Sequence, residues 1–140
     1  SPADLYERPE NAFVAEFIGE NNRLSGELKS ADGNTCIVDV AGQPILALNV
    51  NGQQTGESCI LSLRPERITL NPELGRYPNI FNAKVLELIY LGDHIRCRMS
   101  VCANDNFIVK VPNTKVVLSL KEGEDVSVGW HSEDCRALKA

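Results

Sequence analysis

Polar and apolar residues alternate along most of the chain after residue 22, which is the pattern of half-buried β-strands. The clearest run covers residues 95–103, and the alternation resumes over residues 107–111. The turn-forming sequence Asn104-Asp105-Asn106 lies between the two runs. We therefore expect a hairpin with its turn at residues 104–106. Its inward face would be made of Ile95, Cys97, Met99, Val101, Ala103, Phe107, Val109 and Val111.

Two parts of the chain repeat this pattern. When the chain is aligned with itself so that Gly56-Glu57 falls on Gly123-Glu124, the apolar positions that follow also coincide. A second alignment places the strand that starts near Asn22 on one that starts near Asn82. Many short strands separated by turns are typical of a small β-barrel or sandwich, here made of two related units.

Residues 1–19 lack this alternation, and we expect two short helical pieces there. Pro2 suits the first position of a helix, and Pro9 interrupts it because proline has no backbone N–H. Gly19 is a typical helix stop. The second piece would need a neighbour to cover one apolar face, which consists of Phe13, Val14, Phe17 and Ile18.

The totals limit the possible partners and compartments. A net charge of −5 argues against nucleic acid, whose protein partners usually carry a clustered basic surplus. Five cysteines are an odd number, so a complete disulfide framework within one chain is excluded. No apolar run reaches the roughly 18–20 residues that span a bilayer. We therefore expect a cytoplasmic protein with reduced thiols.

A search for catalytic and ligand-binding motifs is negative. No phosphate-binding loop and no Gly-x-Gly-x-x-Gly motif is present. The tripeptide that begins at Leu24 shares three letters with LSGGQ, but it lies in a strand pattern, so we assign it no nucleotide role. Cys97 and Cys102 would face opposite sides of one strand, and His94 and His131 have no ligand partner nearby. We expect no metal site and no catalytic residue.

Two charged features remain open. His94, Arg96 and Arg98 follow the outward face of one strand, either as an anion-binding stripe or as a solvated sheet surface. No exposed aromatic residues are interleaved for base stacking, which favours the solvated surface and leaves a protein partner possible. The second feature is the corner Arg64-Pro65-Glu66, where proline ends a strand. It is echoed by Glu133, which favours a structural corner whose further role is contact.

Several segments together resemble one family. Residues 2–19, PADLYERPENAFVAEFIG, resemble the last helical segment of the ATP-binding subunits of ABC importers. The Arg-Pro-Glu corner, residues 90–93 and residues 109–113 resemble the region that follows it, the transport-associated OB (TOBE) domain. Residues 90–94 and 130–138 are most similar to the spermidine/putrescine group. Importers of sugars, iron and oxyanions share the architecture.

This resemblance implies a mainly β, OB-like barrel fold. Residues 20–73 and 80–140 would form its two related units, and residues 1–19 would be the end of an ATPase domain. The core of that ATPase domain is absent from this chain. The resemblance therefore implies no catalysis, metal or cofactor here, with ATP and Mg²⁺ bound in the absent domain.

The implied role is a regulatory and dimerisation domain of an importer's ATP-binding subunit, with an effector-sensing barrel as the alternative. Expected partners are a second copy, the chain's own ATPase domain and membrane permease subunits, at the inner face of the plasma membrane. The candidate contact residues are Arg64, Pro65, Glu66, Gly92, Asp93, His94, Trp130 and Glu133.

Overall fold

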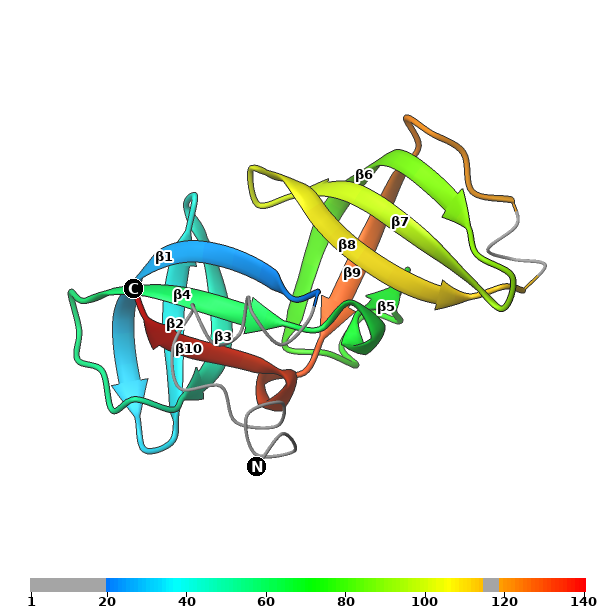
Figure 1. The fold of residues 1–140 in the computed structure, drawn as a ribbon. Helices are drawn as coiled ribbons and strands as arrows, with labels where there is room; N and C mark the ends of the chain where they lie inside the picture. The colour runs from blue at the N-terminus through cyan, green and yellow to red at the C-terminus, as the bar shows by residue number, and fades with distance from the viewer. Residues whose placement is uncertain (1–19, 115–118) are drawn as a thin grey trace, which may run out of the picture. The chain divides into compact units, whose positions relative to one another are not determined.

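The computed structural model describes residues 20–114 and 119–140, which form two compact units built almost entirely of β-strands (Figure 1). The helical segment expected at residues 1–19 lies outside the described residues. Within the part of the chain that the structure describes, no helix has the length and apolar character needed to cross a membrane.

The first unit is a closed five-stranded barrel. Neighbouring strands in the order β4-β1-β2-β3 pair antiparallel, and β10 closes the barrel by pairing antiparallel with β4 and parallel with β3. Closure removes free strand edges, and the alternate apolar residues of each strand fill the interior. The strands are β1 (Asn22–Asp32), β2 (Thr35–Val40), β3 (Gln43–Asn49), β4 (Ser58–Leu63) and β10 (Cys135–Lys139).

The second unit has the same strand order but remains open. Its sheet runs β5-β9-β6-β7-β8, which corresponds to β10-β4-β1-β2-β3, and no described residues of β8 and β5 pair with each other. A partly open five-stranded barrel is typical of OB folds, so the expected mainly β, OB-like architecture of two related units is confirmed. The strands are β5 (Thr69–Leu70), β6 (Asn79–Tyr90), β7 (His94–Val101), β8 (Asn104–Pro112) and β9 (Asp125–Trp130).

The repeat that places Gly56-Glu57 on Gly123-Glu124 is present in the structure. β4 and β9 have the same order of exposed and buried positions. The turns before them also match: the Glu57 carboxylate accepts the backbone N–H of Gln54 at 3.2 Å, and the Glu124 carboxylate accepts that of Lys121 at 3.1 Å. The same side chain thus closes the same turn in both units.

The expected match of Asn22 with Asn82 is wrong, because Asn22 corresponds to Asn79 in the structure. Asn22 starts β1 opposite the last residue of β4, and Asn79 starts β6 opposite the last residue of β9. A β-bulge follows Leu28 in β1 and Val85 in β6, which are equivalent positions when each strand is counted from its asparagine. Burial explains the error, because Asn22 and Asn79 are both buried whereas Asn82 is exposed.

Each corner carries the chain into the other unit. After β4, the 3₁₀ turn η1 (Pro65–Arg67) leads to β5, which pairs with β9. After β9, the turn η3 (Ser132–Asp134) leads to β10, which pairs with β4. The units therefore divide after Arg64 and after Trp130. This differs from the expected ranges 20–73 and 80–140, because each unit takes its fifth strand from beyond a corner.

The β7–β8 turn lies at Cys102-Ala103 and not at residues 104–106 as expected. Both residues have a left-handed backbone, with φ of 49° and 64°, as in a two-residue type I′ hairpin turn. Asn104 instead begins β8, where its side-chain oxygen accepts the N–H of Asn106 at 2.8 Å. The prediction was based on the usual turn-forming residues, Asn104-Asp105-Asn106. Ala103, which was expected on the inward face, is exposed because it lies in the turn.

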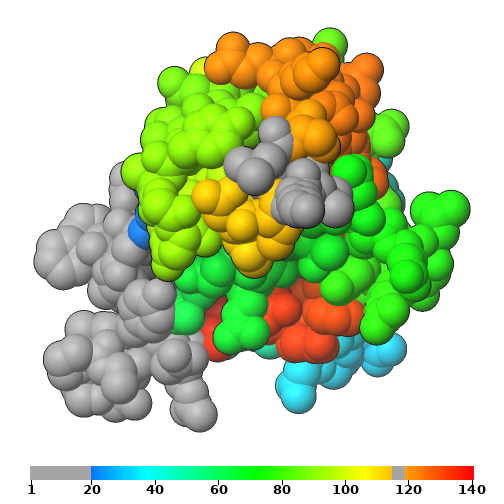
Figure 2. Space-filling view, turned by 90° about the vertical axis from the view of Figure 1, so that its right-hand side faces the viewer, coloured from blue at the N-terminus to red at the C-terminus, as the bar shows by residue number. Residues whose placement is uncertain are grey.

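The loop between β5 and β6, residues 71–78, stands out from the surface (green in Figure 2). Leu74 on this loop is 91% exposed. Residues 74–79, which fall between the two expected ranges 20–73 and 80–140, lie inside the second unit and not between the two units.

Candidate functional site

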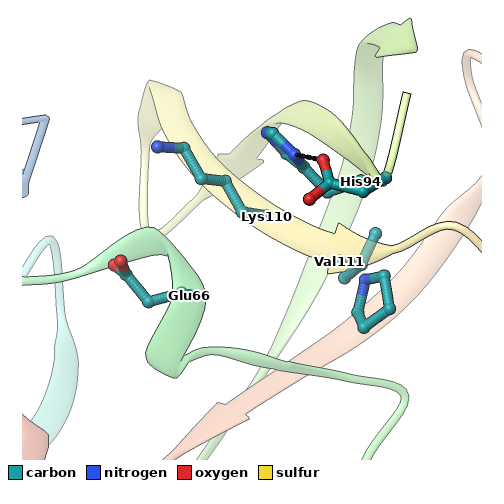
Figure 3. Close-up of a pocket in the computed structure, with 6 residues that line it drawn as sticks. Glu66, His94, Lys110 and Val111 are labelled. Atoms are coloured by element: carbon teal, nitrogen blue, oxygen red, sulfur yellow. Dashed lines mark hydrogen bonds and ion pairs between the residues drawn. The ribbon is translucent and has the colours of Figure 1, made fainter. Parts of the chain in front are cut away.

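Three of the residues selected from the sequence meet in the second unit. Glu66 on η1, Asp93 in the β6–β7 turn and His94 at the start of β7 line an open pocket of about 390 Å³ (Figure 3). The remaining lining residues come from the end of β8 and are Lys110, Val111 and Pro112. A corner, a hairpin turn and a strand end thus converge on one depression.

Asp93 and His94 form an ion pair on one side of the pocket. His94 Nδ1 lies 2.9 Å from Asp93 Oδ1 (Figure 3). The hydrogen bond and charge of His94 hold the pKa of the Asp93 carboxyl below its ordinary value, so this group is ionised at neutral pH. The Asp93 side chain is 93% exposed and that of His94 is 34% exposed, which places the pair at the solvent boundary.

The turn that carries Asp93 and His94 is held by hydrogen bonds to Asn113, the residue that follows β8. The Asn113 side chain donates to the Gly92 carbonyl at 2.9 Å, and the Asn113 backbone N–H donates to the Asp93 carbonyl at 3.2 Å. Gly92 has a φ of 75°, a left-handed conformation that glycine adopts without steric cost. Gly92 therefore positions Asp93 and His94 without lining the pocket itself.

The lining suits binding better than catalysis. It combines two carboxylates, from Glu66 and Asp93, with the Lys110 ammonium group, and its apolar part comes from Val111 and Pro112. Such a mixture can hold a small polar molecule by charge and hydrogen bonds while its carbon skeleton lies on the apolar side. The lining contains no serine, threonine or cysteine nucleophile that His94 could activate.

The other candidate residues lie elsewhere. Arg64 and Glu133 belong to the first unit, and Pro65 is buried at the start of η1. Trp130, expected as a contact residue, has a fully buried side chain. Its ring lies 5.4 Å from that of Phe81 and 5.7 Å from that of Phe107, measured between centroids, so it belongs to the core of the second unit.

Sequence reasoning missed the part of the pocket contributed by β8. His94 pairs with Pro112 and Arg96 pairs with Lys110 in the β7–β8 hairpin. The correct hairpin register would have revealed this neighbourhood. The expected turn at residues 104–106 gave a shifted register, in which His94 would lie opposite a position beyond the end of β8.

The basic residues of β7 are tied into their own sheet. Arg98 donates through Nη1 to the Asp105 carbonyl at 2.9 Å, and its Nε lies 3.4 Å from Glu87 Oε1. Arg96 lies directly opposite Lys110. The use of Arg98 within the sheet supports the solvated sheet surface over an anion-binding stripe.

The cysteines form no disulfide, and four of the five are buried. Burial raises the pKa of Cys59 and of Cys97 to about 11, so both thiols are protonated at neutral pH. Over residues 20–114 and 119–140, no group of three or more histidine, cysteine or carboxylate side chains is arranged to hold a metal ion. The buried thiols act as small apolar residues.

Comparison with known proteins identifies the class to which this fold and site belong. The sequence profile of the TOBE domain matches residues 61–138, from β4 to β10. This match covers more than half of the chain, so the chain belongs to the TOBE domain family.

Curated relatives extend the similarity over nearly the whole chain. The spermidine/putrescine import ATP-binding protein PotA of Rubrobacter xylanophilus is 34% identical over 140 residues, covering 98% of this chain and 36% of the relative. The Fe(3+) ions import ATP-binding protein FbpC of Brucella suis is 36% identical over 128 residues, covering 91% of this chain and 34% of the relative. The chain thus spans about a third of the length of these relatives.

A solved structure supports the fold independently of sequence. The cytoplasmic molybdate-binding protein ModG superposes with a TM-score of 0.68 at 15% sequence identity, covering 85% of this chain and 96% of that protein. At this identity the likeness establishes the fold alone.

Proposed function

We propose that this chain is the non-catalytic regulatory and dimerisation domain of the ATP-binding subunit of an ABC importer for spermidine or putrescine. The observation that carries this proposal is the similarity to ATP-binding subunits named for spermidine/putrescine import, which extends over 98% of the chain at 34% identity. Membership of the TOBE family supports the same assignment. The Fe(3+) relative supports the wider class of importers and leaves other solutes as alternatives.

The proposed mechanism is mechanical. Two copies of the domain remain associated while the ATPase domains attached to them open and close. Holding the ATPase domains together raises their effective concentration to the millimolar range for a short flexible connection, so that closure becomes a nearly intramolecular step. A two-fold contact would use the same patch on both copies. ATP and Mg²⁺ would bind in the ATPase domain, and permease subunits would place the complex at the inner face of the membrane.

Two measurements test this role. Purified chain should hydrolyse no ATP, and measurable turnover that copurifies with it would contradict the proposal. Sedimentation at protein concentrations approaching the millimolar range should reveal a dimer. A chain that remains monomeric there would argue against dimerisation, while leaving its membership of the subunit untouched.

A second candidate function is the sensing of a small effector. The observation that favours it is the convergence of Glu66, Asp93 and His94 on one pocket. Thermal-shift screening against polyamines, sugars and oxyanions should reveal a compound that raises the melting temperature. The shift should disappear in Glu66→Gln and persist in Glu133→Gln, a matched change on the first unit's 3₁₀ turn η3. Equal loss in both variants would contradict binding in this pocket.

A further inference from the structure

The two units can be compared residue by residue. On β3 and β8, Leu48 corresponds to Lys110 and Asn49 to Val111, because each occupies the matching position of its hairpin. β5 and β10, the strands that follow the two corners, are here called the exchanged strands. Arg136 of β10 pairs with Ser62, and Thr69 of β5 pairs with Gly129. Gly129 of β9 matches Ser62 of β4, because Ser62 pairs with the second residue of β1 and Gly129 pairs with the second residue of β6. Thr69 therefore corresponds to Arg136, and the residues that follow them, Leu70 and Ala137, also correspond.

These equivalent strands are joined in one unit and separate in the other. In the first unit, Arg136 pairs with Leu48 and Ala137 with Asn49, and these two parallel rungs close the barrel. In the second unit β5 and β8 also approach each other. Over the described residues, however, no rung joins Thr69-Leu70 to Lys110-Val111.

The pocket lies at this open seam. Lys110 and Val111 line it, and so does Glu66 on the 3₁₀ turn that leads into β5. Figure 3 shows η1 with Glu66 on one side of the space and the end of β8 on the other. The pocket therefore lies beside the place where the first unit has its closing rungs, since the β8 residues of that place line it and the β5 residues do not.

We propose that the second unit has a closed state in which β5 pairs with β8 as β10 pairs with β3, and that this closure removes the pocket. A ligand that binds the open pocket would then select the open barrel, since a ligand shifts an equilibrium toward the state it binds. This regulation deepens the effector-sensing proposal and rests on it. The closure itself is an independent property of the fold.

The sequence after β5 limits the number of rungs that the closed state can form. β10 contains five residues, whereas β5 contains two. Asn71, with a φ of 48°, then turns the chain away. Its N–H donates to the Ser127 carbonyl at 2.8 Å, and its side-chain oxygen accepts the Ser127 N–H at 3.0 Å. Pro72 follows and has no N–H to donate, so the seam can form few rungs.

A pair of cysteines at the seam tests closure directly in the intact chain. The test variant is Thr69→Cys with Lys110→Cys, and the matched control is Arg136→Cys with Leu48→Cys, which are already paired. Both are made with Cys102→Ser, because Cys102 is the cysteine that is not fully buried. Paired strands bring Cα atoms within the roughly 4.4–6.8 Å that a disulfide requires.

Both pairs should oxidise to completion, as followed by mass spectrometry of peptides. The test pair should react about 10- to 1000-fold more slowly than the control, because a minor state typically accounts for roughly 0.1–10% of molecules. Because the test pair removes Lys110 from the pocket lining, the effect of a compound is measured on the unaltered chain, where a compound that raises the melting temperature should speed amide exchange at residues 69–70 and 110–111. A test pair that stays reduced while the control oxidises would overturn the proposal.

Amide exchange measured by NMR provides a second readout. In the oxidised test variant, exchange at residues 69–70 and 110–111 should slow at least tenfold, and the His94 ring signals should shift. A disulfide that forms without either change would show that the strands meet without pairing, and would also overturn the proposal. If no compound binds but both cysteine results hold, the effector proposal fails and seam closure stands.

Discussion

A single methyl group added at Gly26 should strongly lower the free energy of unfolding of the first barrel. A Cβ atom built at this position would lie closer than 3.0 Å to three atoms of β2: the Asp39 carbonyl oxygen and a methyl group each of Val38 and Val40. Atoms in real structures essentially never approach a Cβ so closely. Gly26 therefore lets β1 lie against β2 at a distance that no other residue allows.

The cost follows from which atoms are met. Overpacking a well-filled interior typically costs about 1–3 kcal/mol. Two of the three atoms belong to side chains that can rotate slightly, but the carbonyl oxygen moves only with its strand. We therefore place Gly26→Ala near the upper end, at about 3 kcal/mol. At about 4–8 °C per kcal/mol for a small domain, the melting temperature should fall by roughly 12–24 °C.

Urea unfolding followed by circular dichroism measures this change. The control is Ser25→Ala on the neighbouring exposed position, expected within about 0.5 kcal/mol of the unchanged chain. Ala83, the equivalent of Gly26 on β6, already carries a Cβ, so the restriction belongs to the first barrel. A Gly26→Ala chain as stable as the control would refute the reasoning.

Three further predictions follow from the exchanged strands, the hairpin turn and the ion pair. Deletion of residues 131–140 removes β10, so amide protection should be lost in β1–β4 and retained in β6–β9. Deletion of Ala140 alone should change neither, and equal loss in both units would contradict the division of the chain into two units. Ala103→Gly relieves a left-handed alanine and should stabilise the chain by about 0.5–1 kcal/mol in urea unfolding, whereas Ala31→Gly in β1 should destabilise it by a similar amount. NMR titration should place the pKa of Asp93 below its ordinary value, and His94→Ala should raise it back toward that value. The Asp93 carboxylate therefore contributes stability above its ordinary pKa, and this contribution is lost as pH falls through the lowered pKa. An unchanged Asp93 midpoint in His94→Ala would contradict the interaction.

The sequence predicted strands and their inward faces well, because alternation is a local property of a half-buried sheet. Val126, Val128 and Trp130 all point inward as the repeat indicated. It predicted the β7–β8 turn wrongly, because Cys102 and Ala103 carry no turn preference and accept a left-handed backbone only where the hairpin requires it. That error shifted the register and hid Lys110 from the candidate site.

Burial corrected the repeat in a similar way. Asn22 and Asn82 have similar neighbours in sequence, but Asn79 occupies the buried position equivalent to Asn22. Trp130 likewise looked like a contact residue until its ring was found between Phe81 and Phe107. The sequence gives the type of each of these residues, but only the packing of the folded chain distinguishes a core position from a surface position.

The sequence by itself determined the β class, the repeat of the two corners and the family, since each depends on patterns within a few dozen residues. Only the tertiary structure decided that β5 and β10 change units, because strand pairing joins residues far apart in the chain, such as Lys139 with Cys59. The same long-range pairing closes the first barrel and leaves the second open. Glu66 thus lines the pocket together with the end of β8, which pairs with β7 but with no described residue of β5, and no local pattern of residues could show this.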